Sequence, residues 1–304
     1  MEDKFHIVSK YDHHKIFGAV FVPEDMPIRG IVQISHGMCE HKERYFDFMR
    51  FLNGHGYITV ISDHRGHGES IEAEKDLGYF GDTNGDAIVE DLLQVTLYIK
   101  GRFPGYDVIL LGHSMGSLVV RKYIQNHDAQ ISKLIVCGSP SQNPLVGVGI
   151  AIAKIIGMFK GAHYRSEFVK QLATGGGNKR FAQENDPLSW VVGDPKVREA
   201  YRNDPYCNFT FTVNGYLNLF YLVKHVYTGS RYKVSHPDLP ILFIAGAEDP
   251  VIQSEEKWRA AQTFLKNVGY QNVGGILYAG MRHEILNEIG KEKVYNDILQ
   301  FILK

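Results

Sequence analysis

The sequence has little of what marks secreted, membrane-spanning or nucleic-acid-binding proteins. Cysteine is scarce: three occur among 304 residues, an odd and sparse number that does not suit a disulfide framework. Neither sign of charge dominates, because 33 Lys and Arg face 34 Asp and Glu, for a formal net charge of -1. Without a basic field, the overall charge suggests no nucleic-acid partner. We therefore expect Cys39, Cys137 and Cys207 to be free thiols in a protein that binds no nucleic acid.

Long hydrophobic runs are also missing. The most apolar window, residues 146–159, is too short to span a bilayer and is interrupted by three glycines. Residues 1–6 are polar and lack the basic region and apolar core of a signal peptide. Together these absences predict a soluble, cytoplasmic protein.

What is present is a regular alternation of strand and helix patterns. With 44% hydrophobic residues, a chain of this length can bury the core of one large α/β domain. Residues 4–9 and 16–22 alternate apolar and polar side chains, which predicts an antiparallel hairpin. Short apolar runs then alternate with helical periodicity, which predicts a mostly parallel central sheet covered by helices on both faces. The expected strands are 31–35, 57–62, 107–111 and 133–138, and the expected helices include 43–52 and 87–100.

The alternation fails after residue 138. From there to residue 236 come an apolar, glycine-containing helix at 145–159, a loop with three glycines at 175–177, and an aromatic-rich run at 206–227. The regular pattern then resumes, with strands expected at 239–245 and 275–278 and helices at 254–266 and 291–302.

This break predicts how the chain is divided. Residues 1–138 and 237–304 should form the core, and residues 139–236 a helical lid inserted after the sixth strand. An apolar segment such as 148–153 often simply packs on its own domain. Above an active site it would instead line an acyl pocket or touch a lipid surface.

A Gly-x-Ser-x-Gly pattern lies between the run at 107–111 and the helical stretch that follows it. It comprises Gly112, Ser114 and Gly116. The glycines leave room where strand and helix pass closely, and the sharp turn exposes the serine hydroxyl at the top of the sheet. We therefore predict that Ser114 is a catalytic nucleophile.

A serine hydroxyl needs a base, and the base needs a third group to orient it. In hydrolases whose serine lies in such a turn between a strand and a helix, the catalytic residues follow in the chain order serine, acid, histidine. The acid is expected after the strand at 239–245, where Glu248 and Asp249 occur, and we choose Asp249 because the shorter carboxylate suits the turn. The base is expected after the strand that ends at Tyr278, and of 14 histidines His283 alone falls there. Asp249 and His283 are the predicted partners of the serine.

The oxyanion that forms during acyl transfer needs two backbone donors. The expected donors are the amides of Met115, which follows the nucleophile, and Met38, in the loop after the strand at 31–35. This chemistry requires no cofactor and no metal. Histidines elsewhere show no recognised metal-ligand spacing, and those considered are His36, His41, His64 and His67.

Two further features flank the loop of Met38. A modified thiol at Cys39 would block the site by bulk; equally, Cys39 is an inert small residue. Glu40 and Arg44 are spaced one helical turn apart. Such a pair either braces a surface, worth about 0.2–0.5 kcal/mol, or fixes the oxyanion loop.

These motifs together resemble those of monoacylglycerol lipases and their bacterial lysophospholipase relatives, within the serine-aminopeptidase-like hydrolases. Residues 36–45 resemble the H-G-x-x-E-H-x-x-R-Y oxyanion loop, and residues 63–70 the D-x-x-G-H-G-x-S loop. Residues 112–116 match the elbow, and 203–205 resemble an N/S-D-P element late in the lid. The similarity covers almost the whole chain and weakens in the lid, where substrate choice resides. Cys39 departs from the small residue, often glycine, of the family loop.

The resemblance implies an α/β-hydrolase fold with a lid, and a carboxylic ester hydrolase. Its substrate would be a small lipid-like ester of a single acyl chain, foremost a monoacylglycerol or lysophospholipid, cleaved through an acyl-enzyme on Ser114. Transient contact of the lid with a membrane surface belongs to the same expectation; the sequence carries no signal for an oligomeric state. The alternatives are a carboxylesterase, thioesterase or aminopeptidase for a non-lipid substrate, and a non-catalytic ligand-binding receptor.

Overall fold

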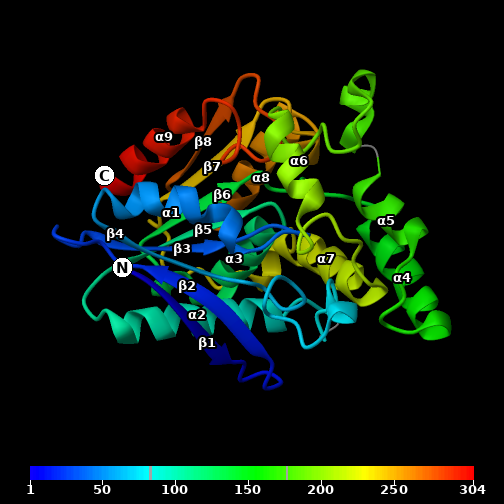
Figure 1. The fold of residues 1–304 in the computed structure, drawn as a ribbon, viewed down its shortest axis with the longest axis horizontal. Helices are drawn as coiled ribbons and strands as arrows, with labels where there is room; N and C mark the ends of the chain where they lie inside the picture. Colours follow the sequence, from blue (N-terminus) through cyan, green and yellow to red (C-terminus); the bar gives the residue numbers. More distant parts are fainter. Residues whose placement is uncertain (82–83, 176) are drawn as a thin grey trace.

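The computed structural model describes residues 1–81, 84–175 and 177–304 (Figure 1). The described strands are β1 (Glu2–Val8), β2 (Lys15–Phe21), β3 (Gly30–Ser35), β4 (Tyr57–Ser62), β5 (Val108–His113), β6 (Lys133–Cys137), β7 (Ile241–Gly246) and β8 (Val273–Tyr278). They form one sheet of order β1-β2-β4-β3-β5-β6-β7-β8. β2 pairs antiparallel with β1 and with β4, and the other neighbours in this order are parallel. The opening hairpin is therefore confirmed.

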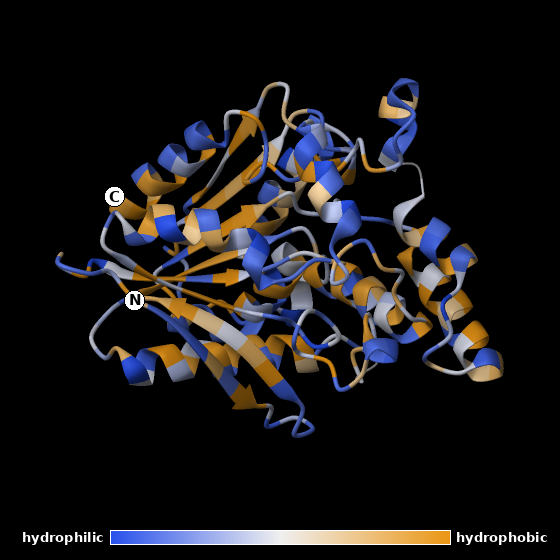
Figure 2. Cartoon of the chain, viewed as in Figure 1, coloured by the Kyte–Doolittle hydropathy of each residue, from blue (hydrophilic) through white to orange (hydrophobic). Residues whose placement is uncertain are grey.

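Helices cover both faces of this sheet (Figure 1). One face carries α1 (Phe46–Asn53) and α9 (Lys291–Leu303), and the other carries α2 (Ala87–Arg102), α3 (Met115–His127) and α8 (Glu255–Asn267). Because both faces are covered, β3, β4, β5 and β7 are buried along their whole length. Figure 2 accordingly shows the central strands mostly in the colour of hydrophobic residues. The predicted α/β class, with a mostly parallel sheet between two helical layers, is confirmed.

The helix expected at 43–52 begins later than its periodicity suggests. A 3-10 turn occupies Lys42–Tyr45, and α1 starts at Phe46. In this tighter turn the Arg44 guanidinium and the Tyr45 hydroxyl both reach the Glu40 carboxylate, at 2.8 and 2.7 Å. Hydrogen bonds from Arg44 and Tyr45 to the preceding loop thus accompany the 3-10 turn that replaces the start of the expected α-helix.

Between β6 and β7 the chain leaves the sheet, and we call residues 138–240 the inserted segment. It contains α4 (Val146–Lys160), α5 (Glu167–Thr174), α6 (Pro195–Asn203) and α7 (Val213–Val226). These helices lie at the end of the sheet toward which the parallel strands point, away from both chain termini (Figure 1). α7 is largely buried between the core helix α3 and α4, whereas α4 buries little of its own surface.

Short 3-10 turns complete the described chain. In addition to Lys42–Tyr45 they are Glu74–Asp76, Asp128–Gln130, Gly177–Glu184, Gly229–Arg231 and Pro250–Ile252. Of the glycine loop expected at 175–177, Gly175 ends α5 and Gly177 begins a 3-10 turn, while Gly176 lies outside the described residues. None of the described helices has both the length and the apolar character that crossing a bilayer requires.

Candidate active site

Ser114 forms the turn between β5 and α3. Its backbone has φ 52° and ψ -117°, a region that residues with a side chain rarely adopt. Its amide donates to the carbonyl oxygen of Cys137 at 2.9 Å, which ties the turn to β6. A Cβ on Gly116 would overlap the carbonyl of Ser35, and a Cβ on Gly112 would overlap that of Gly116. Both glycines therefore permit the close passage of strand and helix that holds Ser114 in place.

Ser114, His283 and Asp249 form a hydrogen-bonded chain. Nε2 of His283 lies 2.8 Å from Ser114 Oγ, and Nδ1 lies 2.9 Å from Asp249 Oδ2. All three side chains are buried, and the second oxygen of Asp249 accepts from the Val251 amide at 2.8 Å. The carboxylate is thus held in one orientation. In this arrangement His283 can take the proton of Ser114 while Asp249 orients the ring.

Asp249 and His283 lie in the two turns where an acid and a base are expected from the sequence. Asp249 follows β7, and His283 follows β8. The neighbouring Glu248 does not contact the histidine; its carboxylate lies 3.7 Å from the guanidinium of Arg180. The ring centroid of Trp190, from the inserted segment, lies 5.3 Å from that of His283. No sequence pattern indicated that contact.

The two predicted backbone donors lie beside the serine. Met38 and Met115 line the same cavity as Ser114. Met115 is the first residue of α3, and the first amides of a helix have no acceptor within it. Among the described residues, the Met38 amide has no backbone acceptor. Both amides can therefore donate to an oxyanion that forms next to Ser114.

Glu40 holds the loop that carries Met38. One of its carboxylate oxygens accepts from the Gly37 amide at 2.5 Å and from the Tyr45 hydroxyl at 2.7 Å. The other accepts from Arg44 at 2.8 Å. The Glu40–Arg44 pair therefore does more than brace a surface, because it bonds directly to the backbone next to Met38.

The same network reaches the backbone of His283. Arg44 donates to both carboxylate oxygens of Glu284, at 2.6 Å each. His113 places Nδ1 3.3 Å from Glu40 and Nε2 3.2 Å from the carbonyl oxygen of His283. Sequence reasoning did not predict that Glu284 and His113 belong to this network. The spacing of Glu40 and Arg44 was the available signal, since the other partners are far apart along the chain.

The charges in this network stabilise each other. Burial alone would raise the pKa of Glu40, but the hydrogen bond with His113 and the charge of Arg44 hold it well below its ordinary value. Burial alone would lower the pKa of His113, but the hydrogen bond to Glu40 and its charge raise it. A protonated His113 can donate to Glu40 from Nδ1 and to the His283 carbonyl from Nε2. The electrostatics thus favour an ion pair between Glu40 and His113, which links the loop of Met38 to the backbone of His283.

Cys39 is buried beside the oxyanion loop. Its thiol donates to the carbonyl oxygen of Phe209 at 2.9 Å. Burial, reinforced by the charge of Glu40, raises the pKa of this thiol. Because the thiolate is the reactive form, these surroundings favour the interpretation of Cys39 as an inert residue.

Buried histidines lie under the same loop and bond to the protein. The rings of His36 and His64 are 4.3 Å apart between centroids, and His36 Nε2 accepts from the His64 amide at 2.9 Å. Nε2 of His64 lies 2.9 Å from Ser35 Oγ. Burial lowers the pKa of the adjacent His67 to about 3. These residues therefore support the loop as neutral rings.

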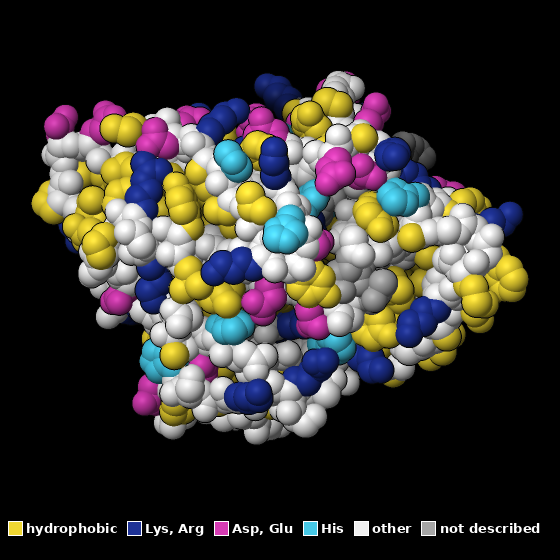
Figure 3. All heavy atoms as spheres, turned by 90° about the horizontal axis from the view of Figure 1, so that it is seen from below, with side chains coloured by type: hydrophobic (Ala, Val, Ile, Leu, Met, Phe, Trp, Pro, Cys, Tyr) yellow, Lys and Arg dark blue, Asp and Glu magenta, His cyan; other side chains and the backbone are white. Residues whose placement is uncertain are grey.

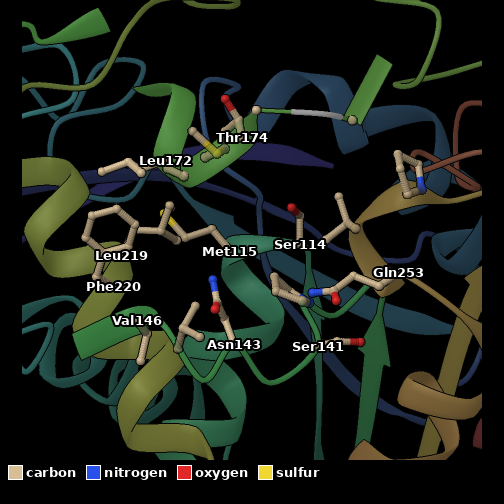
Figure 4. Close-up of a pocket in the computed structure, with 18 of the residues that line it drawn as sticks. Ser114, Met115, Ser141, Asn143, Val146, Leu172, Thr174, Leu219, Phe220 and Gln253 are labelled. Atoms are coloured by element: carbon tan, nitrogen blue, oxygen red, sulfur yellow. The ribbon is translucent and has the colours of Figure 1, made fainter. Parts of the chain in front are cut away.

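A cavity of about 390 Å³ opens beside the Ser114 hydroxyl. Figure 4 shows Leu172 of α5, Leu219 and Phe220 of α7, and Val146 of α4 to one side of the serine. All line this cavity. The inserted segment therefore supplies an apolar wall next to the reactive hydroxyl.

A second cavity, of about 560 Å³, meets the first at Ser114. Met38 and Trp190 line both cavities. The second is more polar, and its wall includes Glu40, Lys170, Gln171, Asn178, Arg202 and Asn208. Ser114 thus borders both an apolar cavity and a relatively more polar one, which we call the polar cavity although Leu188, Val191 and Phe209 also line it.

Comparison with known proteins places these features in context. The family model described as serine aminopeptidase, S33, matches residues 26–290. Monoacylglycerol lipase of Mycolicibacterium smegmatis is 27% identical over 290 residues, 93% of this chain and 91% of that protein. Monoglyceride lipase of Homo sapiens is 33% identical over 118 residues, 39% of this chain and 37% of that protein.

Solved structures share the same architecture. A thermostable carboxyl esterase from Bacillus coagulans, solved in complex with glycerol, superposes with a TM-score of 0.89 at 28% identity. The match covers 99% of this chain and 97% of that one. The likeness therefore extends through the inserted segment as well as the core.

Proposed function

Because this chain belongs to the serine aminopeptidase (S33) family, we propose that it cleaves monoacylglycerols or lysophospholipids through an acyl-enzyme on Ser114. It is a monoacylglycerol lipase-like carboxylic ester hydrolase of the α/β-hydrolase fold.

The apolar cavity beside the serine carries the proposal. Its wall of aliphatic and aromatic side chains suits a single acyl chain, whose burial stabilises the complex by about 0.8 kcal/mol per CH2. The polar cavity on the other side of Ser114 suits a glycerol or phosphodiester head group. The Bacillus coagulans esterase, solved with glycerol, is consistent with glycerol as a leaving group.

Acylation follows from the geometry of the three side chains. Ser114 Oγ attacks the ester carbonyl carbon as its proton passes to Nε2 of His283, 2.8 Å away. Asp249 stabilises the imidazolium, and the amides of Met38 and Met115 donate to the oxyanion. The intermediate collapses when the ester C–O bond breaks and His283 returns the proton to the leaving alkoxide.

Deacylation repeats these steps with water as the nucleophile. His283 removes a proton from water, which attacks the acyl-Ser114 carbonyl, and the fatty acid leaves as Ser114 recovers its proton. The reaction uses only groups of this chain and water.

We assign the lid to residues 139–236 and a membrane-surface contact to its outer face. Figure 3 shows hydrophobic side chains gathered at the end of the molecule where α4 lies, with basic side chains beside them. Exposed large apolar residues on this segment include Leu145, Val148, Ile155, Met158, Phe159 and Phe168. Such a patch next to the acyl cavity would let a single-chain lipid pass from a surface to Ser114. We assign this reaction to the cytoplasm, where buried cysteines such as these stay as free thiols.

The membrane contact predicts a defined effect of two exposed residues. Replacing Met158 and Phe159, 74% and 76% exposed, by Ser should weaken binding to phosphatidylcholine vesicles about tenfold or more. The matched control is Leu97→Ser, on the exposed side of α2. Equal vesicle binding by both variants would remove this part of the proposal.

Aminopeptidase activity fits the cavity less well. A free amino terminus is a cation, and an acidic side chain near the nucleophile would complement its charge. No Asp or Glu lines the apolar cavity within the described residues. In the polar cavity, Glu40 and Glu284 are already bonded to Arg44. These observations favour the ester of a fatty acid.

A substrate panel tests the proposal. Release of fatty acid and of alcohol should be measured with monoacylglycerols, lysophosphatidylcholines, triacylglycerols and aminoacyl anilides, and Ser114→Ala serves as the control. We expect single-chain lipids of medium or long acyl length to give the highest kcat/KM and the Ala variant to be inactive. Turnover of only short aryl esters or anilides would overturn the lipid assignment. Retention of unconverted ligand would point to a receptor.

A further inference from the structure

A histidine, an aspartate and a cysteine meet where the oxyanion loop touches the inserted segment. His41 directly follows Glu40, while Asp204 and Cys207 lie between α6 and α7. One potential ligand atom from each lies within 4.8 Å of the others. Nε2 of His41 is 2.8 Å from Asp204 Oδ2. The sequence spacing gave no hint of this group, since His41 and Asp204 are 163 residues apart.

Local backbone structure aims the three side chains at each other. Asp204 ends α6, and the amide of Cys207 donates to its carbonyl oxygen at 3.0 Å, closing a four-residue turn. The Tyr206 amide donates to Asp204 Oδ1 at 2.8 Å, which leaves Oδ2 for His41. The carboxylate and the thiol are therefore presented from one turn, and the imidazole from the opposite side.

The donor set has the chemistry of a zinc site. Imidazole nitrogen, thiolate sulfur and carboxylate oxygen are the ligands that Zn²⁺ takes, usually four in a tetrahedron. We propose that His41, Asp204 and Cys207 bind a divalent zinc-like cation, with water as the fourth ligand. Binding releases the thiol proton of Cys207 to solvent, so that sulfur coordinates as the thiolate.

Burial and charge around the group favour a cation. His41 and Cys207 are buried, whereas the Asp204 side chain is 29% exposed and lines a cavity of about 300 Å³. Of the three ligands only Asp204 borders this cavity, together with Arg44 and Lys196, so solvent reaches the group from its carboxylate side. Nearby, two buried carboxylates, Glu40 and Glu284, share one guanidinium, that of Arg44. With His113, which pairs with Glu40, Arg44 balances these two carboxylates. The two negative charges that match a divalent cation are therefore those of Asp204 and of the Cys207 thiolate.

The bound ion would act as a clamp between two parts of the chain. The Asn208 amide already donates to the Cys39 carbonyl at 3.1 Å, so the loop and the inserted segment touch here. A cation held by His41 on one side and by Asp204 and Cys207 on the other would strengthen that contact. The site is separate from Ser114 and its partners, and the ester chemistry proceeds without it.

Cobalt substitution tests the site directly. Purified full-length protein, treated with a chelator and then desalted, is titrated with Co²⁺ and afterwards with Zn²⁺. We expect one Co²⁺ per chain, a thiolate-to-cobalt charge-transfer band, and loss of that band as Zn²⁺ displaces cobalt. Cys207→Ser should abolish the band, whereas Cys137→Ser, a buried thiol on β6, should keep it.

Further variants separate the site from loss of folding. His41→Gln and Asp204→Asn should each weaken Zn²⁺ binding by at least about tenfold. Zn²⁺ should raise the Tm of the unaltered protein and not that of these variants, because only a ligand that binds the folded state stabilises it. Circular dichroism verifies that each variant is folded. The proposal is overturned if the unaltered protein shows no charge-transfer band, or if a folded Cys207→Ser variant retains it.

Discussion

Ser114 keeps its unusual backbone because its neighbours leave no alternative. The turn requires that α3 pass against β3, and Gly116 stands at the point of closest approach. In Gly116→Ala, the new methyl group would meet the carbonyl oxygens of Ser35 and His36. Urea unfolding should show a loss of about 1–3 kcal/mol, the usual cost of overpacking.

A second glycine provides the matched control. Gly101 lies in α2, and a Cβ built there meets nothing within 4 Å. Gly101→Ala should therefore raise the free energy of unfolding by roughly 0.5–1 kcal/mol. If both variants shifted stability in the same direction, the close approach at Gly116 would not be what constrains the elbow.

Two single substitutions distinguish Asp249 from Glu248 as the acid that orients His283. Asp249→Asn leaves an amide that stabilises the wrong tautomer of His283, so kcat should fall by about 10³–10⁴. Glu248→Gln alters only a carboxylate near Arg180 and should leave kcat within about twofold. Steady-state kinetics on one monoacylglycerol compares the two variants, and the opposite ranking would move the acid by one position.

Glu40 gives a prediction that depends on pH. Its pKa lies well below the ordinary value of about 4.5, so its ionised form stabilises the fold above that pH. Glu40→Gln should cost about 3–5 kcal/mol at neutral pH, because Arg44 and the Gly37 amide lose a buried partner. The stabilisation in the unaltered protein is lost as pH falls from about 4.5 toward the lower folded-state pKa, so the difference between the two proteins should narrow there.

An exposed pair supplies the comparison for Glu40. Glu255 bonds to Arg259 at the surface of α8, and Glu255→Gln should change stability by less than about 1 kcal/mol at any pH. A Glu40→Gln difference that stayed constant across the acidic range would mean that its charge does not stabilise the fold.

At the scale of elements, period and turn chemistry were enough to predict most of the core. The expected helix at 254–266 corresponds to α8, and Ser254 caps it by accepting from the Lys257 amide. The helix expected at 43–52 starts at Phe46, because its first residues bond to Glu40. Hydrophobic periodicity carries no information on such side-chain bonds.

The network around the oxyanion loop likewise shows which contacts a local sequence pattern can predict and which it cannot. The Glu40–Arg44 spacing was visible because both residues lie one turn apart. Arg44 and Glu284 are 240 residues apart, and His113 and His283 are 170 apart. These residues become neighbours only in the folded sheet, where the carboxyl ends of β3, β5 and β8 lie at the same end of the sheet.

Helix α7 provides a test of the acyl compartment. Val223 lines the apolar cavity, whereas Lys224 on the same helix is exposed. Val223→Trp should lower kcat/KM for a long-chain monoacylglycerol by at least about tenfold and leave a short-chain ester nearly unaffected. Lys224→Trp, with the same added bulk, should preserve the chain-length profile. Matching profiles would mean that α7 does not border the acyl chain.

At the scale of the whole molecule, the inserted segment and the carboxyl ends of the parallel strands together form the site. The core contributes Ser114, Asp249 and His283, and the inserted segment contributes Trp190 and the apolar wall. The positions of Ser114, Asp249 and His283 could be predicted from the sequence because each follows a recognisable strand. The volume and polarity of the two cavities could not, since they arise from packing between segments distant in the chain.

The most direct measurement of the central claim is the rate at which alkyl phosphonate esters inactivate the protein, with the modified residue identified by peptide mapping. These reagents mimic the tetrahedral intermediate and stay on the nucleophile. We predict a single adduct on Ser114 and inactivation by an octyl phosphonate at least about 100-fold faster than by its methyl counterpart, given the value of each buried CH2. An adduct on another residue, or rates independent of chain length, would contradict the account.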